Sequence, residues 1–306
     1  IATAPAPTRA GYTLLGWSRT TTGSVVSFTG GYAPNDTAGF TLYAIWSANT
    51  LNVTFQSNGG SAVTATTTQT AASILAAPTQ PTRAGYTFAG WFADSNLTGS
   101  AISFSYAHGQ TADFILYAKW TANSLPVTYD SQGGSSVDPG SMFTGGSIAT
   151  APAPTRAGYT LTGWSRTTTG SVVSFTGGYA PNDTAGFTLY AIWSANTLNV
   201  TFQSNGGSAV TATTTQTAAS ILAAPTQPTR AGYTFAGWFA DSNLTGSAIS
   251  FSYAHGQTAD FILYAKWTAN SLPVTYDSQG GSSVDPGSMF TGGSIATAPA
   301  PTRAGY

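Results

Sequence analysis

Cysteine and glutamate are absent from the sequence, and charged residues of both signs make up only 6% of its 306 residues. The lack of cysteine excludes disulfides, thiol catalysis and thiolate metal sites. A formal net charge of -1 offers no electrostatic attraction to nucleic acid or to an anionic membrane surface. We therefore expect neither of these as a partner.

Long apolar runs and catalytic motifs are also missing. No stretch approaches the roughly 18 to 20 apolar residues that a membrane-spanning helix needs, so we expect no membrane insertion in this segment. The motifs of a nucleophile elbow, a phosphate-binding loop, a dinucleotide fold, a zinc protease and an EF-hand do not occur. The sequence thus predicts a protein that is not an enzyme and that needs no cofactor.

An internal repeat organises the residues that are present. The segment that begins at Ile1 returns at Ile148, and the two copies then match to the end of the chain, except that Thr162 stands in place of Leu15. Within this pair a Gly-Tyr segment returns at intervals of about 74 residues, which indicates two related repeat types in alternation.

The alternation divides the chain into type A and type B repeats. The divisions are a partial type A repeat (1–50), a type B repeat (51–124), a type A repeat (125–197), a type B repeat (198–271) and a partial type A repeat (272–306). Because the chain begins and stops within a repeat, we expect either a longer array or broken repeats that a neighbouring chain completes. Residues 272–294 supply the strand-like segments that the opening repeat lacks.

The type B repeat predicts a succession of short strands. Leu51, Val53 and Phe55 alternate with polar residues, as in a strand with one buried face. Asn58-Gly59-Gly60 then predicts a turn with positive φ. The expected later strands are 62–70 as the return strand, 86–91, 101–104 and 114–120. Gly90, inside the strand at 86–91, indicates that a large side chain or another backbone approaches it closely.

One stretch of the type B repeat has a helical composition. Residues 71–77 lie before Pro78 and Pro81, which cannot continue a helix, so one or two turns are the most that we expect. The equivalent type A stretch, 147–152, is shorter and interrupted by proline, which predicts a vestigial helix.

Aromatic side chains are the predicted core. A repeat of about 74 residues lies near the lower size limit for an independent core, so its large rings are needed inside. The predicted core residues are Tyr86, Phe88, Trp91, Tyr117, Trp120, Tyr159, Trp164, Trp193, Trp238 and Trp267.

Arg83, Arg156 and Arg230 occupy one position in successive repeats, beside the Gly-Tyr-Thr segment. Stacking of the guanidinium on a neighbouring tyrosine or tryptophan is one interpretation. A contact between repeats is the other, and both remain open at this point.

The remaining titratable residues do not form a site. His108 and His255 both precede glycine, and we interpret them as solvated turn residues, since one histidine per pair of repeats is too few for a zinc site. Asp130 and Asp138 flank a Gly/Ser segment, but too few oxygen ligands accompany them for calcium. Turn capping is the better interpretation, so we expect no metal.

Three sequence blocks recur in the same order in each complete repeat. They are V-T-F-x-S-N-G-G at 53–60, P-T-R-A-G-Y-T-F-A-G-W at 81–91 and L-Y-A-K-W at 116–120. These blocks resemble the Listeria/Bacteroides repeat, or internalin B-repeat, family, over the whole chain. Type A departs at Tyr129, at 160–162 and at Ile192, which weakens any role for the lysine of the third block. The resemblance implies compact β-grasp, ubiquitin-like modules that bacterial surface proteins use as spacers, stalks or adhesive units, without catalytic residues.

These observations predict a mostly β (α+β) protein, built as a tandem array of small β-grasp modules that form an extended rod or fibre. The expected role is structural, at the cell surface or outside a bacterial cell, and the expected partner is the chain itself through neighbouring repeats or copies. The alternative is a multivalent adhesin that binds glycans or host proteins through exposed aromatic rings.

Overall fold

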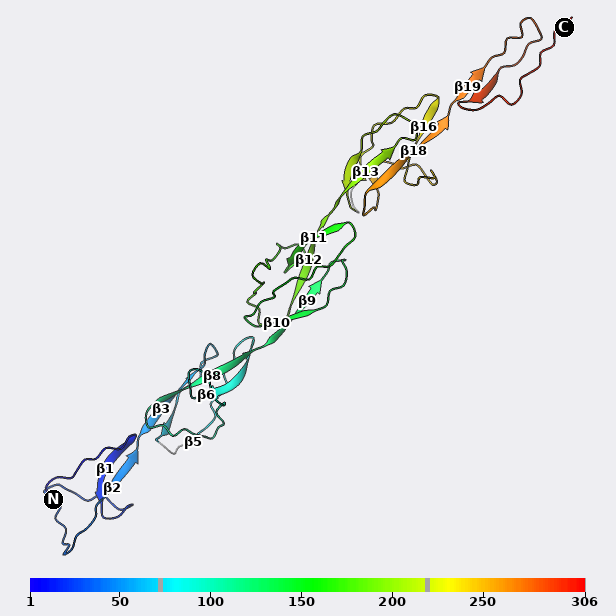
Figure 1. The fold of residues 1–306 in the computed structure, drawn as a ribbon. Coiled ribbons are helices and arrows are strands. Elements are labelled where there is room, and N and C mark those ends of the chain that lie inside the picture. The colour runs from blue at the N-terminus through cyan, green and yellow to red at the C-terminus, as the bar shows by residue number, and fades with distance from the viewer. Residues whose placement is uncertain (71–73, 218–220, 306) are drawn as a thin grey trace. The chain divides into compact units, whose positions relative to one another are not determined.

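The computed structural model describes residues 1–70, 74–217 and 221–305. Every regular element in these residues is a β-strand, which confirms the expectation of a mostly β protein (Figure 1). The first ten strands are β1 (Tyr12–Ser18), β2 (Tyr43–Ala48), β3 (Thr50–Gln56), β4 (Thr66–Gln69), β5 (Ile74–Leu75), β6 (Tyr86–Phe92), β7 (Tyr106–Ala107), β8 (Phe114–Ala122), β9 (Ser124–Asp130) and β10 (Gly140–Phe143). The remaining strands of the described chain are β11 (Tyr159–Ser165), β12 (Phe187–Ala195), β13 (Thr197–Gln203), β14 (Thr213–Gln216), β15 (Ile221–Leu222), β16 (Tyr233–Phe239), β17 (Tyr253–Ala254), β18 (Phe261–Ala269), β19 (Ser271–Val274) and β20 (Gly287–Phe290).

The chain contains two compact units. The first comprises Ile1–Thr128, Pro139–Thr150 and Phe175–Phe187, and the second comprises Tyr129–Asp138, Ala151–Ser174 and Thr188–Tyr306. The boundary falls within the type A repeat 125–197, so each type B repeat lies inside a single unit.

The type B repeat of the first unit forms a four-stranded sheet in the order β4-β3-β8-β6. Its central strands, β3 and β8, run parallel, with Val53 opposite Phe114 and Gln56 opposite Tyr117. The outer strands are antiparallel to their neighbours, β4 to β3 and β6 to β8. The chain therefore enters the repeat on one central strand and leaves it on the other.

The type B repeat of the second unit has the same arrangement, with the order β14-β13-β18-β16 and a parallel central pair. A short antiparallel pair accompanies each of these sheets, β5 with β7 and β15 with β17. The type A segments contribute the antiparallel pairs β1 with β2, β9 with β10, β11 with β12, and β19 with β20.

The turn after β3 has the predicted geometry. Asn58 and Gly59 have φ values of 49° and 86°, and the Gly60 N–H donates to the Ser57 carbonyl over 3.1 Å. The predicted return strand is too long, because β4 begins only at Thr66. Just before the expected strand, Ser61 donates its backbone N–H to the Thr82 carbonyl, and residues 62–65 are not part of a strand.

A bulge in β6 accounts for the glycine at position 90. Pairing with β8 shifts register between Phe88 and Gly90, and Gly90 has a φ of 120°. A Cβ at Gly90 would lie 2.7 Å from the Ala101 Cβ, so the predicted close approach is confirmed, but the neighbour is a small side chain. The strand predicted at 101–104 is wrong, since Ile102 only donates to the Trp91 carbonyl and the short strand β7 follows later.

The helix predicted at 71–77 is not present in the described part of that stretch, and residues 71–73 lie outside the described residues. Ile74 and Leu75 form β5 and pair with Ala107 and Tyr106. In type A, Ile148 of the 147–152 stretch likewise bridges to Tyr179. A helix of one or two turns is marginal in water, and pairing with another strand satisfies the same backbone groups.

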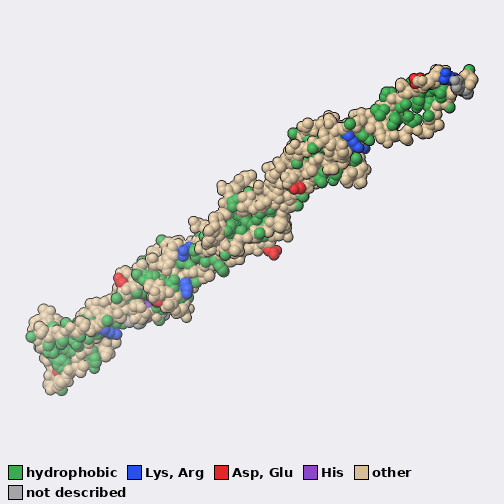
Figure 2. All heavy atoms as spheres, turned by 45° about the horizontal axis from the view of Figure 1, so that its top comes forward, with side chains coloured by type: hydrophobic (Ala, Val, Ile, Leu, Met, Phe, Trp, Pro, Cys, Tyr) green, Lys and Arg blue, Asp and Glu red, His purple; other side chains and the backbone are tan. Residues whose placement is uncertain are grey.

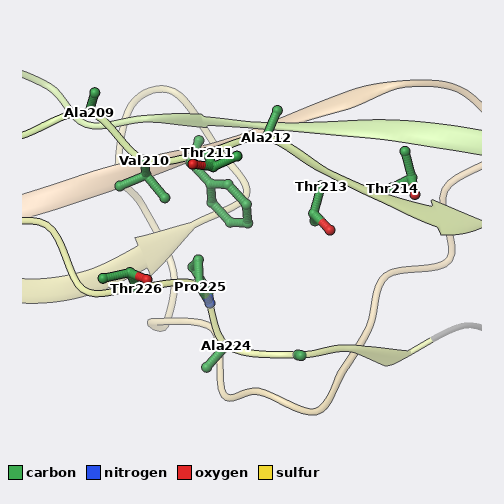
Figure 3. A pocket seen from close by; sticks show the side chains of 11 residues that line it. Ala209, Val210, Thr211, Ala212, Thr213, Thr214, Ala224, Pro225 and Thr226 are labelled. Atoms are coloured by element: carbon green, nitrogen blue, oxygen red, sulfur yellow. The ribbon is translucent and has the colours of Figure 1, made fainter.

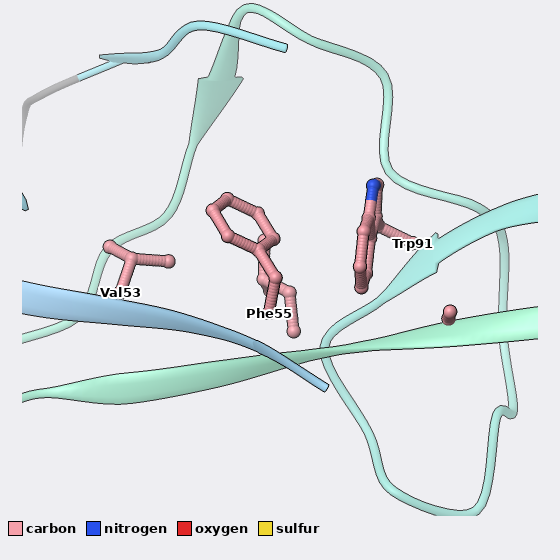
Figure 4. Packing of buried hydrophobic residues seen from close by; sticks show 5 residues of the cluster. Val53, Phe55 and Trp91 are labelled. Atoms are coloured by element: carbon pink, nitrogen blue, oxygen red, sulfur yellow. The ribbon is translucent and has the colours of Figure 1, made fainter. Parts of the chain in front are cut away.

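The core of the type B repeat lies on one face of its sheet (Figure 4). Val53, Phe55, Trp91, Leu116 and Ala118 form the buried cluster, with side chains 0% to 6% exposed. The second type B repeat has the equivalent cluster around Trp238. Full burial of an aromatic side chain contributes about 2–3 kcal/mol, so a few such rings stabilise a small repeat without disulfides.

Candidate functional site: the junctions between repeats

The predicted core residues occupy three kinds of environment. Trp91, Trp164 and Trp238 are buried, at 3%, 1% and 3% exposure. The second tryptophan of each complete repeat is half-buried, and its indole N–H donates to a serine carbonyl. These pairs are Trp120 with Ser57 (2.8 Å), Trp193 with Ser131 (2.9 Å) and Trp267 with Ser204 (2.8 Å). Tyr86, Phe88, Tyr117 and Tyr159 are half-buried.

The structure brings only some of these rings together. The Phe88 ring lies between the two indoles, with its centroid 5.5 Å from Trp91 and 5.4 Å from Trp120. Phe55, which the sequence analysis placed in a strand but not in the core list, lies 5.0 Å from Trp91. The alternation of Phe55 with polar residues in the sequence was the signal for its place in the core. Tyr117 is not part of this cluster and lies between the buried Leu116 and Ala118 in β8.

The arginines at the shared position stack on tyrosine. The Cζ atoms of Arg83, Arg156 and Arg230 lie 3.9, 4.0 and 4.0 Å from the ring centroids of Tyr86, Tyr159 and Tyr233. Each Nη1 also donates over 3.1 Å to a backbone carbonyl in the turn of its own repeat, at Asn58, Gln132 and Asn205 respectively. These contacts tie the turn to the Gly-Tyr-Thr segment within one repeat.

The interpretation of the histidines as solvated turn residues is wrong. His108 is only 6% exposed, and its ring stacks on Phe114 with centroids 5.0 Å apart. Its Nδ1 accepts the Gln110 N–H over 3.0 Å, and its Nε2 lies 3.3 Å from the Thr68 hydroxyl. The ring is buried because it satisfies a loop amide and covers an aromatic neighbour. A His-Gly dipeptide carries no sign of either contact.

The aspartates hold turns and strand ends together. Asp130 accepts the Gln132 N–H over 2.9 Å, as turn capping predicts. The Thr98 hydroxyl and, to a smaller extent, the Asn96 N–H donate hydrogen bonds to Asp94 and lower the pKa of its carboxyl. The side chain and, to a smaller extent, the backbone N–H of Asn52 lower the pKa of the Asp113 carboxyl in the same way. The described residues contain no group of three histidine, cysteine or acidic side chains that could hold a metal ion.

An open groove lies beside the edge strand of each type B sheet. In the second type B repeat the groove is lined by residues 209–214 and 223–226 and by Phe202 (Figure 3). The lining residues are alanine, threonine, valine, proline and one phenylalanine, so the groove offers no titratable group for chemistry. On the face shown in Figure 2 the charged side chains lie far apart and do not gather into a patch.

The feature that recurs with matching geometry at four places is a junction centred on asparagine. We call Asn49, Asn123, Asn196 and Asn270 the junction asparagines. Each is the single residue between the last strand of one repeat and the first strand of the next, as Asn123 is between β8 and β9. Within each unit, its hydrogen bonds reach both repeats.

Toward the preceding repeat, each junction asparagine makes two hydrogen bonds. Its backbone N–H donates to the glycine carbonyl of the Gly-Tyr-Thr segment, at Gly11, Gly85, Gly158 and Gly232, over 2.9, 2.9, 2.8 and 2.9 Å. Its Oδ1 accepts the hydroxyl of the threonine in that segment, at Thr13, Thr87, Thr160 and Thr234, over 2.6, 2.7, 2.7 and 2.6 Å. The backward bonds therefore use both the main chain and the side chain.

Toward the following repeat, the asparagine carbonyl accepts twice from one threonine. The backbone donors are Thr70, Thr144, Thr217 and Thr291, over 3.0, 2.9, 3.0 and 2.9 Å. The hydroxyls of the same residues lie 3.3, 3.4, 3.3 and 3.3 Å from that carbonyl. One residue thus fixes the end of one repeat and the start of the next.

The glycine of each junction is a point of close approach. Gly85 has a φ of +78°, and a Cβ there would lie 2.6 Å from the Thr144 Cγ2 of the next repeat. Gly232 and Thr291 have the same relationship. Any larger residue would push the two repeats apart, so the glycine permits the asparagine hydrogen bonds to form.

The junctions were missed by the sequence analysis. The signal was the Ala-Asn dipeptide before each new strand, together with the glycine of the Gly-Tyr-Thr segment. Neither the dipeptide nor the glycine indicates a junction until the strands on either side are known to be neighbours in the structure.

Comparisons with known proteins agree with the repeat pattern. The model of the Listeria-Bacteroides repeat domain matches residues 1–45, 52–119, 126–192, 199–266 and 273–306. A protein of Evansella cellulosilytica that is named a Gly-rich membrane protein is 36% identical over 280 residues, which are 90% of this chain and 31% of that protein. A second E. cellulosilytica protein, named a membrane protein, is 34% identical over 78% of this chain and 34% of its own length.

Internalin H of Listeria monocytogenes is 36% identical over 125 residues, which are 40% of this chain and 22% of internalin H. The chain thus spans about a third of the two Evansella relatives that it matches. In the described residues no helix is long and apolar enough to span a bilayer. The family model covers most of the sequence in five successive segments, and the chain belongs to the Listeria-Bacteroides repeat family.

Proposed function

We propose that this chain is a structural repeat region of a bacterial surface or secreted protein, in which serial repeats build an extended, semi-rigid stalk. The observation that carries the proposal is the junction asparagine, which bonds to both repeats in the same way at each of four described junctions. A linker of one residue with bonds in both directions leaves little freedom to bend. In such an array, length is set by the number of repeats.

We also infer that the type B repeat is a β-grasp variant. A parallel central pair formed by the first and last long strands, flanked by antiparallel strands, supports this assignment. In this fold the chain enters and leaves through adjacent strands, which suits a serial array. The relatives that are named membrane proteins, and internalin H, support a place at the cell envelope.

The adhesin alternative has less support from the contacts. A sugar-binding aromatic platform needs an accessible ring face, and Trp91, Trp164 and Trp238 are buried in their repeats. The half-buried indoles donate their N–H groups within their own repeats. Retention of the purified chain on a glycan array, together with loss of retention in Trp120→Ala, would favour the adhesin.

A spin-label experiment tests junction rigidity in the full chain. The sequence has no cysteine, so Thr54→Cys and Ser141→Cys, both at exposed positions, provide labels on either side of the Asn123 junction. We expect a narrow distance distribution between the labels. Gly85→Ala should broaden it, because the added Cβ would lie 2.6 Å from Thr144.

Gly99→Ala is the matched control for this substitution. Gly99 has a φ of +75°, close to that of Gly85, but its Cβ would meet no atom within 4 Å. The control therefore carries the same backbone strain without the collision across the junction. A distribution that is already broad in the parent chain would contradict a semi-rigid stalk.

A further inference from the structure

The way the chain passes through the type B repeat has a mechanical meaning. Tension along an array reaches the repeat at Thr50, the first residue of β3, and leaves it at Ala122, the last residue of β8. Because β3 and β8 are parallel neighbours, this tension pulls them in opposite directions along their own axes. The two strands must slide past each other before the repeat can extend.

We propose that this parallel pair is a force-bearing clamp, and that the type B repeat resists tension along the chain much better than tension across its sheet. The proposal rests on the proposed function as a stalk, since a stalk carries load from end to end. Under sliding, all the hydrogen bonds between 53–56 and 114–117 share the load at once. Under crosswise tension the same bonds would be loaded one after another.

Buried side chains protect the clamp from water. Val53 and Leu116 are 0% exposed and Phe55 is 6% exposed, and all three belong to the pair of strands. Water cannot readily reach that face to replace a strained hydrogen bond. A ladder covered in this way is expected to break as a unit, because each unpaired buried backbone group carries a free-energy cost.

The junctions prevent the clamp from peeling at its ends. The Thr70 N–H bonds to the Asn49 carbonyl, which extends the β3–β4 ladder beyond Thr50. The Asn123 N–H bonds to the Gly85 carbonyl, which extends the β6–β8 ladder beyond Ala122. The antiparallel outer strands thus hold both loaded strand ends in the sheet. The second type B repeat has the same parallel register, from Val200 opposite Phe261 to Gln203 opposite Tyr264.

Single-molecule pulling of the full chain in two directions tests the clamp. Thr50→Cys with Thr121→Cys attaches the handles at the two ends of the loaded pair. Gln56→Cys with Ala93→Cys attaches them across the sheet, because Gln56 and Phe92 are both opposite Tyr117. All four substituted positions are exposed, and the chain contains no other thiol.

We expect the mean unfolding force for axial pulling to exceed that for crosswise pulling by about two-fold or more at the same loading rate, because forced unfolding reports the barrier along the pulled direction. Equal forces, or a larger crosswise force, would overturn the clamp. Thr197→Cys with Thr268→Cys and Gln203→Cys with Ala240→Cys repeat the comparison in the second type B repeat. Agreement between the two repeats excludes an effect of one cysteine pair on folding.

The two proposals fail in different ways. The clamp is measured under load within one repeat, whereas the stalk is measured without load across a junction. A broad spin-label distribution with a high axial force would discard the semi-rigid stalk and keep the clamp. A narrow distribution with equal forces would do the reverse.

Discussion

Type A and type B repeats fasten the same strand end by different chemistry. In type B, the Asn52 N–H and side-chain amide donate to the two carboxylate oxygens of Asp113, over 2.8 and 3.0 Å. In type A, Pro126 and Gly186 stand at these positions, and a Cβ on Gly186 would lie 2.6 Å from the Pro126 Cγ. Proline has no N–H to satisfy, so the carboxylate becomes unnecessary and close packing replaces it. The two positions therefore change together.

The two kinds of junction show a similar contrast. Where type A precedes type B, a Cβ on Gly158 would collide with both Thr217 and Thr258, the latter at 3.0 Å. Where type B precedes type A, the three atoms nearest to a Cβ on Gly232 would all belong to Thr291. Thr258 belongs to the loop that contains His255, so only the first kind of junction rests on the histidine loop. The asparagine hydrogen bonds are alike at both.

The largest expected effect is the loss of stability when alanine replaces the glycine of a junction, and its size should differ between the two kinds of junction. Gly158→Ala and Gly232→Ala both place a Cβ at a φ of +77°. We expect each to destabilise the neighbouring repeats by about 2–4 kcal/mol, from left-handed strain and overpacking together. The loss should be greater for Gly158→Ala, which meets two segments, in urea unfolding followed by tryptophan fluorescence. Gly246→Ala, at a φ of +76° with no atom within 4 Å, provides the matched control. Equal losses in all three variants would show that strain alone matters.

A smaller effect should follow from removal of the buried histidine. His255→Ala leaves the Gln257 N–H without its acceptor and removes a ring that lies 5.0 Å from Phe261. We expect a loss of about 1–3 kcal/mol within that repeat. Amide exchange of Thr217, which bonds to Asn196, should accelerate, whereas that of Thr291, which bonds to Asn270, should not. Ser242→Ala, at an exposed position of the same repeat, is the control. Acceleration at both junctions would contradict a local role for the loop.

The smallest expected effect is acid sensitivity of the contact between Asn52 and Asp113, which type A lacks. Hydrogen bonds from Asn52 lower the pKa of Asp113 below its ordinary value. A carboxyl whose pKa is lower in the folded state stabilises the fold above its unfolded pKa, about 4, and loses that contribution as the pH falls through the folded pKa. The Asn52 amide resonance should therefore shift on acidification, and Asp113→Asn should remove the shift. The amides of Leu125 and Val127, on either side of Pro126, should lack this transition. A common transition at Asn52 and at these two amides would refute the assignment.

The sequence was sufficient for the strands whose side chains alternate. In β3, Leu51, Val53 and Phe55 are buried and the polar residues between them are exposed, as their alternation predicts. The turn at Asn58 was also accessible, because positive φ in an Asn-Gly pair is a local property. Both depend on residues that are close in sequence.

Long-range pairing decided what the sequence could not. The composition of 71–77 permits a helix, but Ile74 and Leu75 pair with a segment about thirty residues away. His108 is buried by Thr68 and Phe114, which the dipeptide His-Gly does not indicate. The junction asparagines depend on three segments that meet only after both repeats have folded. Burial and function at these places follow from topology rather than from local preference.

The difference between the two junctions also bears on how such an array can change its length in evolution. Duplication or deletion of an A–B pair recreates the same two joints, so every new copy meets a neighbour for which its surface is already suited. Loss of one repeat alone would place two repeats of the same type in series and create a joint without an established partner loop such as that of Thr258. The unit that recombination can copy without harm is therefore the pair.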